Sequence, residues 1–309
     1  MAIPSLCPLC SANSESQSVV TAHVAGQTKK KRSAFFYCER CKVRYQHPGL
    51  TLEEEANFYS SEFEGFMSQR AGTQGGWLNA EDHIASNETT FKRRFEYLRP
   101  YLGKNIDILE IGCSSGFMLF PLKCLGHKCV GIEPSGYFSE FVRQHNIEVY
   151  DSLQHLSEKN GDSKYDLVMH FFVMEHIADP LRFLKTQVDL LKPGGKIIFE
   201  IPNASDPLYS LYDIPAFERF YWSKAHPWYF NEHSLRYLID QLGIDYKVVL
   251  DQRYDISNHI IWARDGKPGG MKRFSDVFSA EFNEAYKSAL IKSGHCDTLI
   301  CIIEKTAGI

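Results

Sequence analysis

The chain has 309 residues, 23% of them charged and 44% hydrophobic, which is typical of a soluble globular protein. Its formal net charge of −4 disfavours a dedicated nucleic-acid binder, because such proteins usually carry a basic face. The basic run Lys29 to Arg32 is therefore interpreted as a solvated loop rather than an RNA-binding patch. No apolar run approaches the ~20 residues of a membrane span, and no secretory signal is evident, so we expect a cytoplasmic protein.

Two Cys-x-x-Cys pairs dominate the first 50 residues. Cys7 and Cys10 form one pair, and Cys38 and Cys41 form the other, with 27 residues between the pairs. In a reducing compartment such pairs bind metal rather than form disulfides. Four thiolates complete a closed tetrahedral site, so we expect structural Zn²⁺ here. A redox dithiol or four unliganded cysteines are the alternatives.

After a helical stretch over residues 51–100, the pattern changes to strands that alternate with helices. Such alternation predicts βαβ units and a mainly parallel sheet with helices on both faces, a Rossmann-like α/β fold. The strands are expected at 106–111, 128–132, 147–150, 167–171, 196–201, 246–251 and 298–304, and helices at 117–125, 135–145, 180–191 and 280–292.

A glycine-containing turn follows the first of these strands. Gly112 and Gly116 lie where backbone can approach a ligand at the carboxyl edge of the sheet. Glu133 ends the next strand, 17 residues after Gly116, and an acid there can bond both hydroxyls of a ribose. The alternative is a surface acid that caps the following helix. Ser114 replaces the middle glycine of the dinucleotide fingerprint, which argues against bound pyrophosphate.

The ordered elements 110–116, Glu133, 165–180 and 191–195 resemble the motifs of class I S-adenosylmethionine (SAM)-dependent methyltransferases. The resemblance implies a seven-stranded methyltransferase sheet and a SAM cofactor. The residues that it assigns to the cofactor are Glu110, Gly112, Ser114 and Gly116 at the methionine end, Glu133 at the ribose, Asp151 and Ser152 beside the adenine, and Phe171 and Phe172 along the adenosine and sulfonium. Simple core packing is the alternative for the two phenylalanines.

The segment 36–48 resembles the metal-binding lead-in of methyltransferases from sugar and polysaccharide pathways. This second resemblance implies a zinc-binding knuckle at 1–50, a helical lead-in at 51–100, and a SAM-binding domain at 101–309 with a lid at 202–233. It also implies a small-molecule acceptor, in particular a nucleotide-linked sugar in glycan or natural-product biosynthesis. Aromatic residues in the lid would suit a sugar, or could instead pack on the core.

Three residues are candidates for the chemistry. His226 begins a His-Pro-Trp-Tyr-Phe run that resembles a segment of the sugar methyltransferases, in which the leading histidine is the base. Ala225 precedes it, where related enzymes often carry an acid. His176, after the fourth strand, is the alternative base, and Glu175 would orient the base or the substrate. Each histidine could also be structural.

Two other functions remain open at this stage. An RNA or protein methyltransferase could use the zinc knuckle for recognition, although the acidic net charge counts against nucleic acid. A non-catalytic SAM-binding protein could keep the same fold and cofactor residues. The methylated atom and the oligomeric state do not follow from the sequence.

Overall fold

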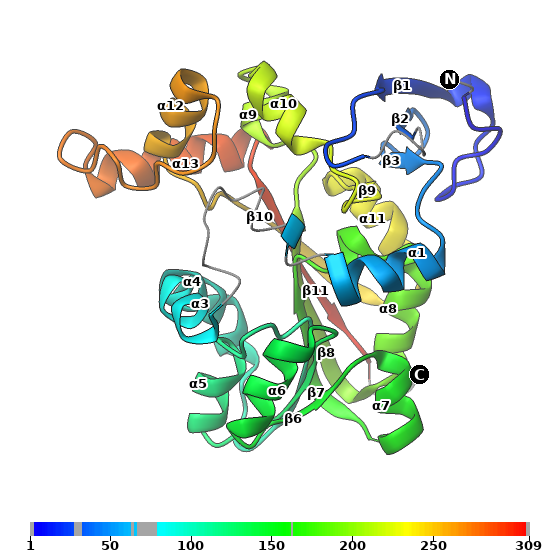
Figure 1. Cartoon of the computed structure of the whole chain (residues 1–309), viewed down its shortest axis with the longest axis vertical. Helices are drawn as coiled ribbons and strands as arrows, with labels where there is room; N and C mark the ends of the chain where they lie inside the picture. Colours follow the sequence, from blue (N-terminus) through cyan, green and yellow to red (C-terminus); the bar gives the residue numbers. More distant parts are fainter. Residues whose placement is uncertain (1–2, 28–32, 63–64, 67–78, 162, 307–309) are drawn as a thin grey trace.

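The computed structural model describes residues 3–27, 33–62, 65–66, 79–161 and 163–306. Its centre is a seven-stranded sheet with the order β10-β11-β8-β7-β4-β5-β6, in which β11 runs opposite to the other six strands (Figure 1). The strands are β4 (Asp107–Ile111), β5 (Lys128–Ile132), β6 (Glu148–Tyr150), β7 (Tyr165–Phe171), β8 (Leu191–Pro202), β10 (Asp245–Asp251) and β11 (Thr298–Glu304). All seven predicted strands are present, and the fifth begins five residues earlier than expected.

Helices cover both faces of this sheet, because alternate strand residues are apolar on both sides. Ile108 of β4 packs in the cluster beneath one set of helices, and its neighbour Leu109 packs in the cluster beneath the other. The first set is α4 (Glu88–Leu98), α5 (Leu119–Cys124) and α6 (Gly136–Gln144), and the second is α7 (Leu153–Asn160), α8 (Pro180–Asp189) and α11 (Glu232–Asp240). The predicted Rossmann-like α/β fold is confirmed.

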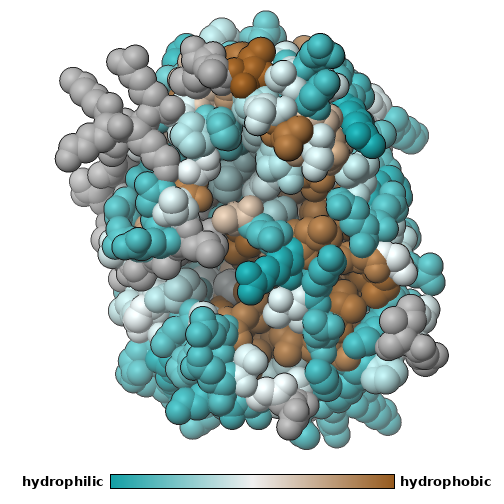
Figure 2. Space-filling model, turned by 90° about the vertical axis from the view of Figure 1, so that its right-hand side faces the viewer, coloured by the Kyte–Doolittle hydropathy of each residue, from teal (hydrophilic) through white to brown (hydrophobic). Residues whose placement is uncertain are grey.

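A second, antiparallel sheet joins the N-terminal segment to the predicted lid. Its order is β1-β2-β3-β9, and β9 follows β8 in the sequence. The strands are β1 (Gln17–Thr21), β2 (Ala34–Cys38), β3 (Arg44–His47) and β9 (Trp228–Tyr229). The backbone N–H of Gln46 donates to the Pro227 carbonyl at 2.8 Å, and the N–H of Ala25 donates to the Trp222 carbonyl at 2.7 Å. Figure 2 views the side that carries these strands and α8, where apolar residues reach the surface among hydrophilic ones.

Helices and helical turns make up much of the remaining chain. They include α1 (Leu52–Asn57), the π-helical turn η2 (Phe58–Glu62), α3 (Ala80–Ser86), α9 (Pro207–Ser210), α10 (Pro215–Tyr221), α12 (Ile256–Asp265), α13 (Ala280–Ser293) and the 3-10 turns η1 (Ser14–Ser16), η3 (Arg99–Tyr101) and η4 (Met174–His176). Residues 63–64 and 67–78 of the predicted helical lead-in, and the basic run at 29–32, lie outside the described residues. No helix in the described part of the chain is long and apolar enough to cross a membrane.

The aromatic residues of the lid are largely core. Phe217, Tyr221 and Trp222 are buried in one cluster with Tyr229 and Trp262. The hydroxyl of Tyr221 donates to the Asn203 carbonyl at 2.9 Å, which ties α10 to the end of β8. These three rings therefore stabilise the lid and do not offer an open platform to a sugar.

Candidate active site and zinc site

The glycine turn after β4 adopts a conformation that its residues make possible. Gly112 has φ +73° and Gly116 has φ +77°, in the left-handed region that glycine enters without strain. A Cβ atom at Gly112 would lie 2.7 Å from Cγ2 of Val173, so no side chain fits there. Ser114 between them has φ +43°. The turn thus leaves bare backbone at the carboxyl edge of the sheet, where nucleotides bind in this architecture.

Glu133 faces this turn from the end of β5. One carboxylate oxygen accepts from the Ser114 backbone N–H at 2.7 Å, and the other accepts from the Ser135 N–H at 2.9 Å. The helix α6 is capped by the Ser135 side chain, which accepts from the Phe138 N–H. These bonds orient the carboxylate across the mouth of the turn. A carboxylate has about four acceptor sites, which makes it a group suited to accept ribose hydroxyls.

The sheet alternation directs Glu110 and Glu200 toward α4, where two arginines bind Glu200. Arg94 Nε donates to Glu200 at 2.7 Å, and Arg93 donates to both Glu200 and Asp251. Glu110 is 2% exposed, and its Oε2 has no hydrogen-bond partner among the described residues. Burial raises the pKa of Glu110 well above its ordinary value. An unpartnered carboxyl beside the glycine turn fits the ammonium group of an amino-acid ligand.

Sequence reasoning missed Arg93 and Arg94, because it interpreted their helix only as amphipathic. Arg94 is 7% exposed. Arginine is rarely buried without a partner, and Glu200 is the partner here. Its guanidinium carbon lies 4.2 Å from the ring centre of Phe171 and 5.6 Å from that of Phe172. The two predicted cofactor-lining rings are therefore stacked against a cation. The signal available in the sequence was the pair of adjacent arginines on a helix that packs against the sheet.

Asp151 and Ser152 follow β6, as the resemblance implied, but both side chains have local partners. Asp151 is exposed and pairs with Arg143 at 3.0 Å. The hydroxyl of Ser152 accepts from the His155 N–H at 3.1 Å and caps α7. Glu133 and Asp151 directly follow the neighbouring parallel strands β5 and β6 at the same edge.

The fold brings Glu175, His176 and His226 together from two distant parts of the chain. One ligand atom from each lies within 4.8 Å of those of the others. The His226 ring packs edge-on against His176, with 4.6 Å between ring centres. His176 Nδ1 lies 2.7 Å from the Ala225 carbonyl. A carbonyl only accepts, so Nδ1 carries the proton and the tautomer of His176 is set.

Glu175 is the buried acid of this group. It is 2% exposed, and neither carboxyl oxygen has a hydrogen-bond partner among the described residues. Burial raises the pKa of Glu175 to about 8, so the carboxyl is mostly protonated at neutral pH. The three side chains could hold a metal ion only after this proton is lost.

The four cysteines of the N-terminal segment form a compact buried cluster. The Sγ atoms of Cys7 and Cys41 are 3.7 Å apart, and those of Cys10 and Cys38 are 3.5 Å apart. A disulfide needs about 2.05 Å. Four thiolates around Zn²⁺, each about 2.3 Å from the ion, lie about 3.8 Å from one another in a tetrahedron. The observed spacing fits this arrangement.

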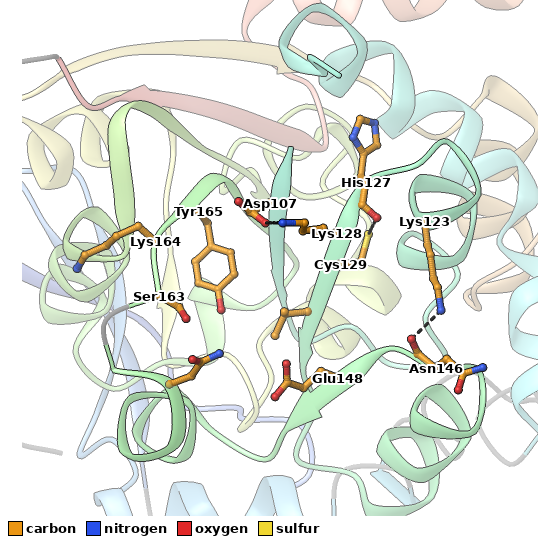
Figure 3. A pocket seen from close by; sticks show the side chains of 12 residues that line it. Asp107, Lys123, His127, Lys128, Cys129, Asn146, Glu148, Ser163, Lys164 and Tyr165 are labelled. Atoms are coloured by element: carbon orange, nitrogen blue, oxygen red, sulfur yellow. Dashed lines mark hydrogen bonds and ion pairs between the residues drawn. The ribbon is translucent and has the colours of Figure 1, made fainter. Parts of the chain in front are cut away.

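A cavity of about 570 Å³ lies at the other edge of the sheet (Figure 3). It is lined where strands begin, by Asp107 of β4, Lys128 of β5 and Tyr165 of β7. None of the predicted site residues lines it. Because parallel sheets bind ligands at the carboxyl ends of their strands, this cavity is not the candidate active site.

The sheet order, the glycine turn and the position of Glu133 define a SAM-dependent methyltransferase of class I. Residues 83–247, more than half of the chain, match the model of the methyltransferase domain family, and the chain belongs to that family.

Similar proteins carry names of the same kind. The "Ubiquinone biosynthesis O-methyltransferase" of Ruegeria pomeroyi is 28% identical over 183 residues, which cover 56% of this chain and 71% of that protein. The protein of that name from Chelativorans sp. is 31% identical over 119 residues, 37% of this chain and 45% of the relative. A crystal structure of a SAM-dependent methyltransferase from Archaeoglobus fulgidus has 20% identity and a TM-score of 0.49, covering 79% of this chain and 100% of the other.

Proposed function

We propose that this methyltransferase acts on a hydroxyl group of a small molecule, with His226 as the base. The observation that carries the proposal is the grouping of Glu175, His176 and His226 beside the end of β7. His226 would accept the hydroxyl proton, and His176 would orient the His226 ring through their edge-on contact. Protonated Glu175 adds no negative charge to the pocket at neutral pH.

The cofactor would bind along β4 and β5. Bound SAM supplies an electrophilic methyl group. Glu110 would hold its ammonium group, Glu133 its ribose hydroxyls, and the backbone at Gly112, Ser114 and Gly116 its methionine end. Phe171 and Phe172 would line the sulfonium side, and Asp151 and Ser152 the adenine. Arg94 bonds Glu200 through Nε, and its two Nη atoms, which have no hydrogen-bond partner among the described residues, suit the cofactor's carboxylate.

The N-terminal cysteines would hold structural Zn²⁺. All four positions of a tetrahedral site are then filled by protein, which leaves none for water or substrate. We propose the division into a zinc knuckle at 1–50, a helical lead-in at 51–100 and a methyltransferase domain at 101–309. The pairing of β3 with β9 suggests that the knuckle supports the lid at 202–233.

The acceptor we favour is a nucleotide-linked sugar. Support comes from the resemblance of the knuckle and of the His226 segment to sugar-pathway methyltransferases. The similar proteins named for ubiquinone biosynthesis make a phenolic hydroxyl the second candidate. Both acceptors are small molecules whose hydroxyl must lose a proton, so both use the same base.

The test is transfer of labelled methyl from SAM to a panel of nucleotide sugars, phenols, total protein and RNA. We expect a labelled nucleotide sugar with the wild-type chain. The label should be lost in His226→Ala and partly restored by added imidazole, because imidazole can replace the missing base. His233→Ala is the matched control, since His233 is exposed on α11.

Three results would contradict the proposal. Label in phenols alone would replace the sugar by the second acceptor and keep the base. Label in protein or RNA alone would refute a small-molecule acceptor and point to recognition by the knuckle. SAM binding without transfer to any acceptor in the panel would favour a non-catalytic SAM-binding protein.

A further inference from the structure

Sheet topology places the end of β10 on the acceptor side of the site. Because β11 is antiparallel to both β8 and β10, strand β10 runs parallel to β7 and β4. Its carboxyl end therefore lies at the same edge as the glycine turn. The proposed cofactor residues lie at the ends of β4, β5, β6 and β7, whereas β10 lies beyond β7 and β8 in the other direction. Arg253 follows β10 directly, at this edge.

A buried carboxylate fixes Arg253 in place. The side chain of Asp297 is completely buried at the start of β11. It accepts from Arg253 Nε at 3.3 Å and from the backbone N–H of Arg253 at 3.1 Å. It also accepts from Gln252 Nε2 at 2.8 Å and from the Tyr254 N–H at 3.0 Å. The whole turn after β10 is thus built around one carboxylate.

The ion pair uses only one of the three guanidinium nitrogens of Arg253. Neither Nη atom has a hydrogen-bond partner among the described residues, and 24% of the side chain is exposed. The guanidinium carbon lies 4.4 Å from the ring centre of Phe172. Arg93 contrasts with it, since both of its Nη atoms bond to Glu200 and Asp251. The two Nη groups of Arg253 are therefore held as hydrogen-bond donors beside the ring of Phe172, the residue after β7.

We propose that Arg253 binds an oxyanion of the acceptor, so that the substrate of this site is an anionic small molecule. This inference rests on the proposed function, which places the acceptor hydroxyl at His226 and the sulfonium beside Phe172, the ring that Arg253 contacts. Two parallel N–H donors match the two oxygens of a phosphoryl or carboxylate group. A nucleotide-linked sugar offers the first oxyanion, and a uronic acid offers the second.

The test is calorimetric binding of inorganic pyrophosphate and of glucuronate to the full chain loaded with S-adenosylhomocysteine. We expect at least one of the two to bind, and Arg253→Gln to weaken it about ten- to hundredfold, as loss of charge-assisted hydrogen bonds does. Arg253→Lys keeps the positive charge but loses the forked pair of guanidinium N–H donors. Its affinity should therefore lie between those of the wild type and Arg253→Gln. Arg264→Gln is the matched control, because Arg264 is exposed and pairs with Asp265.

Several outcomes would overturn the inference. Equal binding by the wild type and Arg253→Gln would do so, and so would no binding of either anion to the wild type. If Arg253→Gln does not fold, unchanged binding in Arg253→Lys would count against the fork. Methylation of a nucleotide sugar with unchanged KM in Arg253→Gln would refute this inference alone. Arg253-dependent anion binding without any methylated sugar would refute the proposed acceptor alone.

Discussion

Glu175 carries the sharpest prediction about stability. Burial raises its pKa from an ordinary 4.5 to about 8 in the folded chain. Between these two values the unfolded chain has lost the proton and the folded chain retains it. The raised pKa therefore adds to the stability of the folded chain. This contribution is fully present below pH 4.5 and is lost as the pH rises through 8. Replacement by glutamine removes this pH dependence and leaves other titrating groups in place.

The size of the effect follows from linkage. Each pH unit between the two pKa values changes the free energy of unfolding by about 1.4 kcal/mol. At pH 7 the accumulated loss in the wild type is about 3 kcal/mol, and it levels off above pH 8. We therefore expect Glu175→Gln to gain stability over the wild type steadily from pH 5 to pH 8.

The measurement is denaturant unfolding of both chains, without SAM, at pH 5, 6, 7, 8 and 9. Packing differences between the carboxyl and the amide add a constant offset, so the slope of the difference carries the information. Glu158→Gln, at an exposed position of α7, is the control and should show no slope of this kind. A difference that stays flat from pH 5 to pH 9 would refute the assignment of Glu175 as a buried, protonated acid.

The remaining predictions concern the metal, the cofactor and the core. Chelation of Zn²⁺, followed by metal analysis, should lower Tm and acceptor methylation while the Kd for S-adenosylhomocysteine changes little; equal loss of both would contradict the separation of knuckle and cofactor site. Glu133→Ala should weaken SAM binding about tenfold or more in calorimetry, as loss of hydrogen bonds to a charged group does, with Glu158→Ala as control; an unchanged Kd would exclude Glu133 from the ribose site. Burial lowers the pKa of His170 to about 3, so its contribution to stability, present above pH 6.5, should fall by about 1.4 kcal/mol per pH unit as the pH drops from 6 to 4. His170→Phe should lack this loss in acid unfolding curves, and parallel curves would argue against a buried neutral imidazole.

The sequence predicted the central sheet well, because its strands are short apolar runs separated by turn residues. β4 and β5 begin and end within one residue of the expected positions. The fourfold cysteine pattern also predicted a cluster that the structure contains. Both signals are local in the chain, and local patterns carry strand and knuckle geometry directly.

Contacts across the sheet were not predictable in the same way. Nothing near Arg94 in the sequence indicates that Glu200, 106 residues later, accepts a hydrogen bond from its Nε. Likewise β9 has two residues, too few to show a strand pattern, and it exists because β3 offers an edge. The lid aromatics suggested a sugar platform, but tertiary packing buried Phe217, Tyr221 and Trp222. These contacts depend on which surfaces meet in the folded chain, and the composition of a segment does not indicate which surfaces these are.

The position of β9 connects the knuckle to the chemistry. His226 lies two residues before β9, and β9 is held in register by Arg44 and Tyr45 of β3. Both residues follow Cys41 within four positions. On the other side, Ala225 contacts His176 through its carbonyl. In the proposed zinc-bound protein, order in β3 would set the position of the His226 ring through β9, whereas the proposed cofactor residues lie at the ends of β4 to β7. A zinc ion with no open coordination position would then act on methyl transfer through the geometry of one histidine.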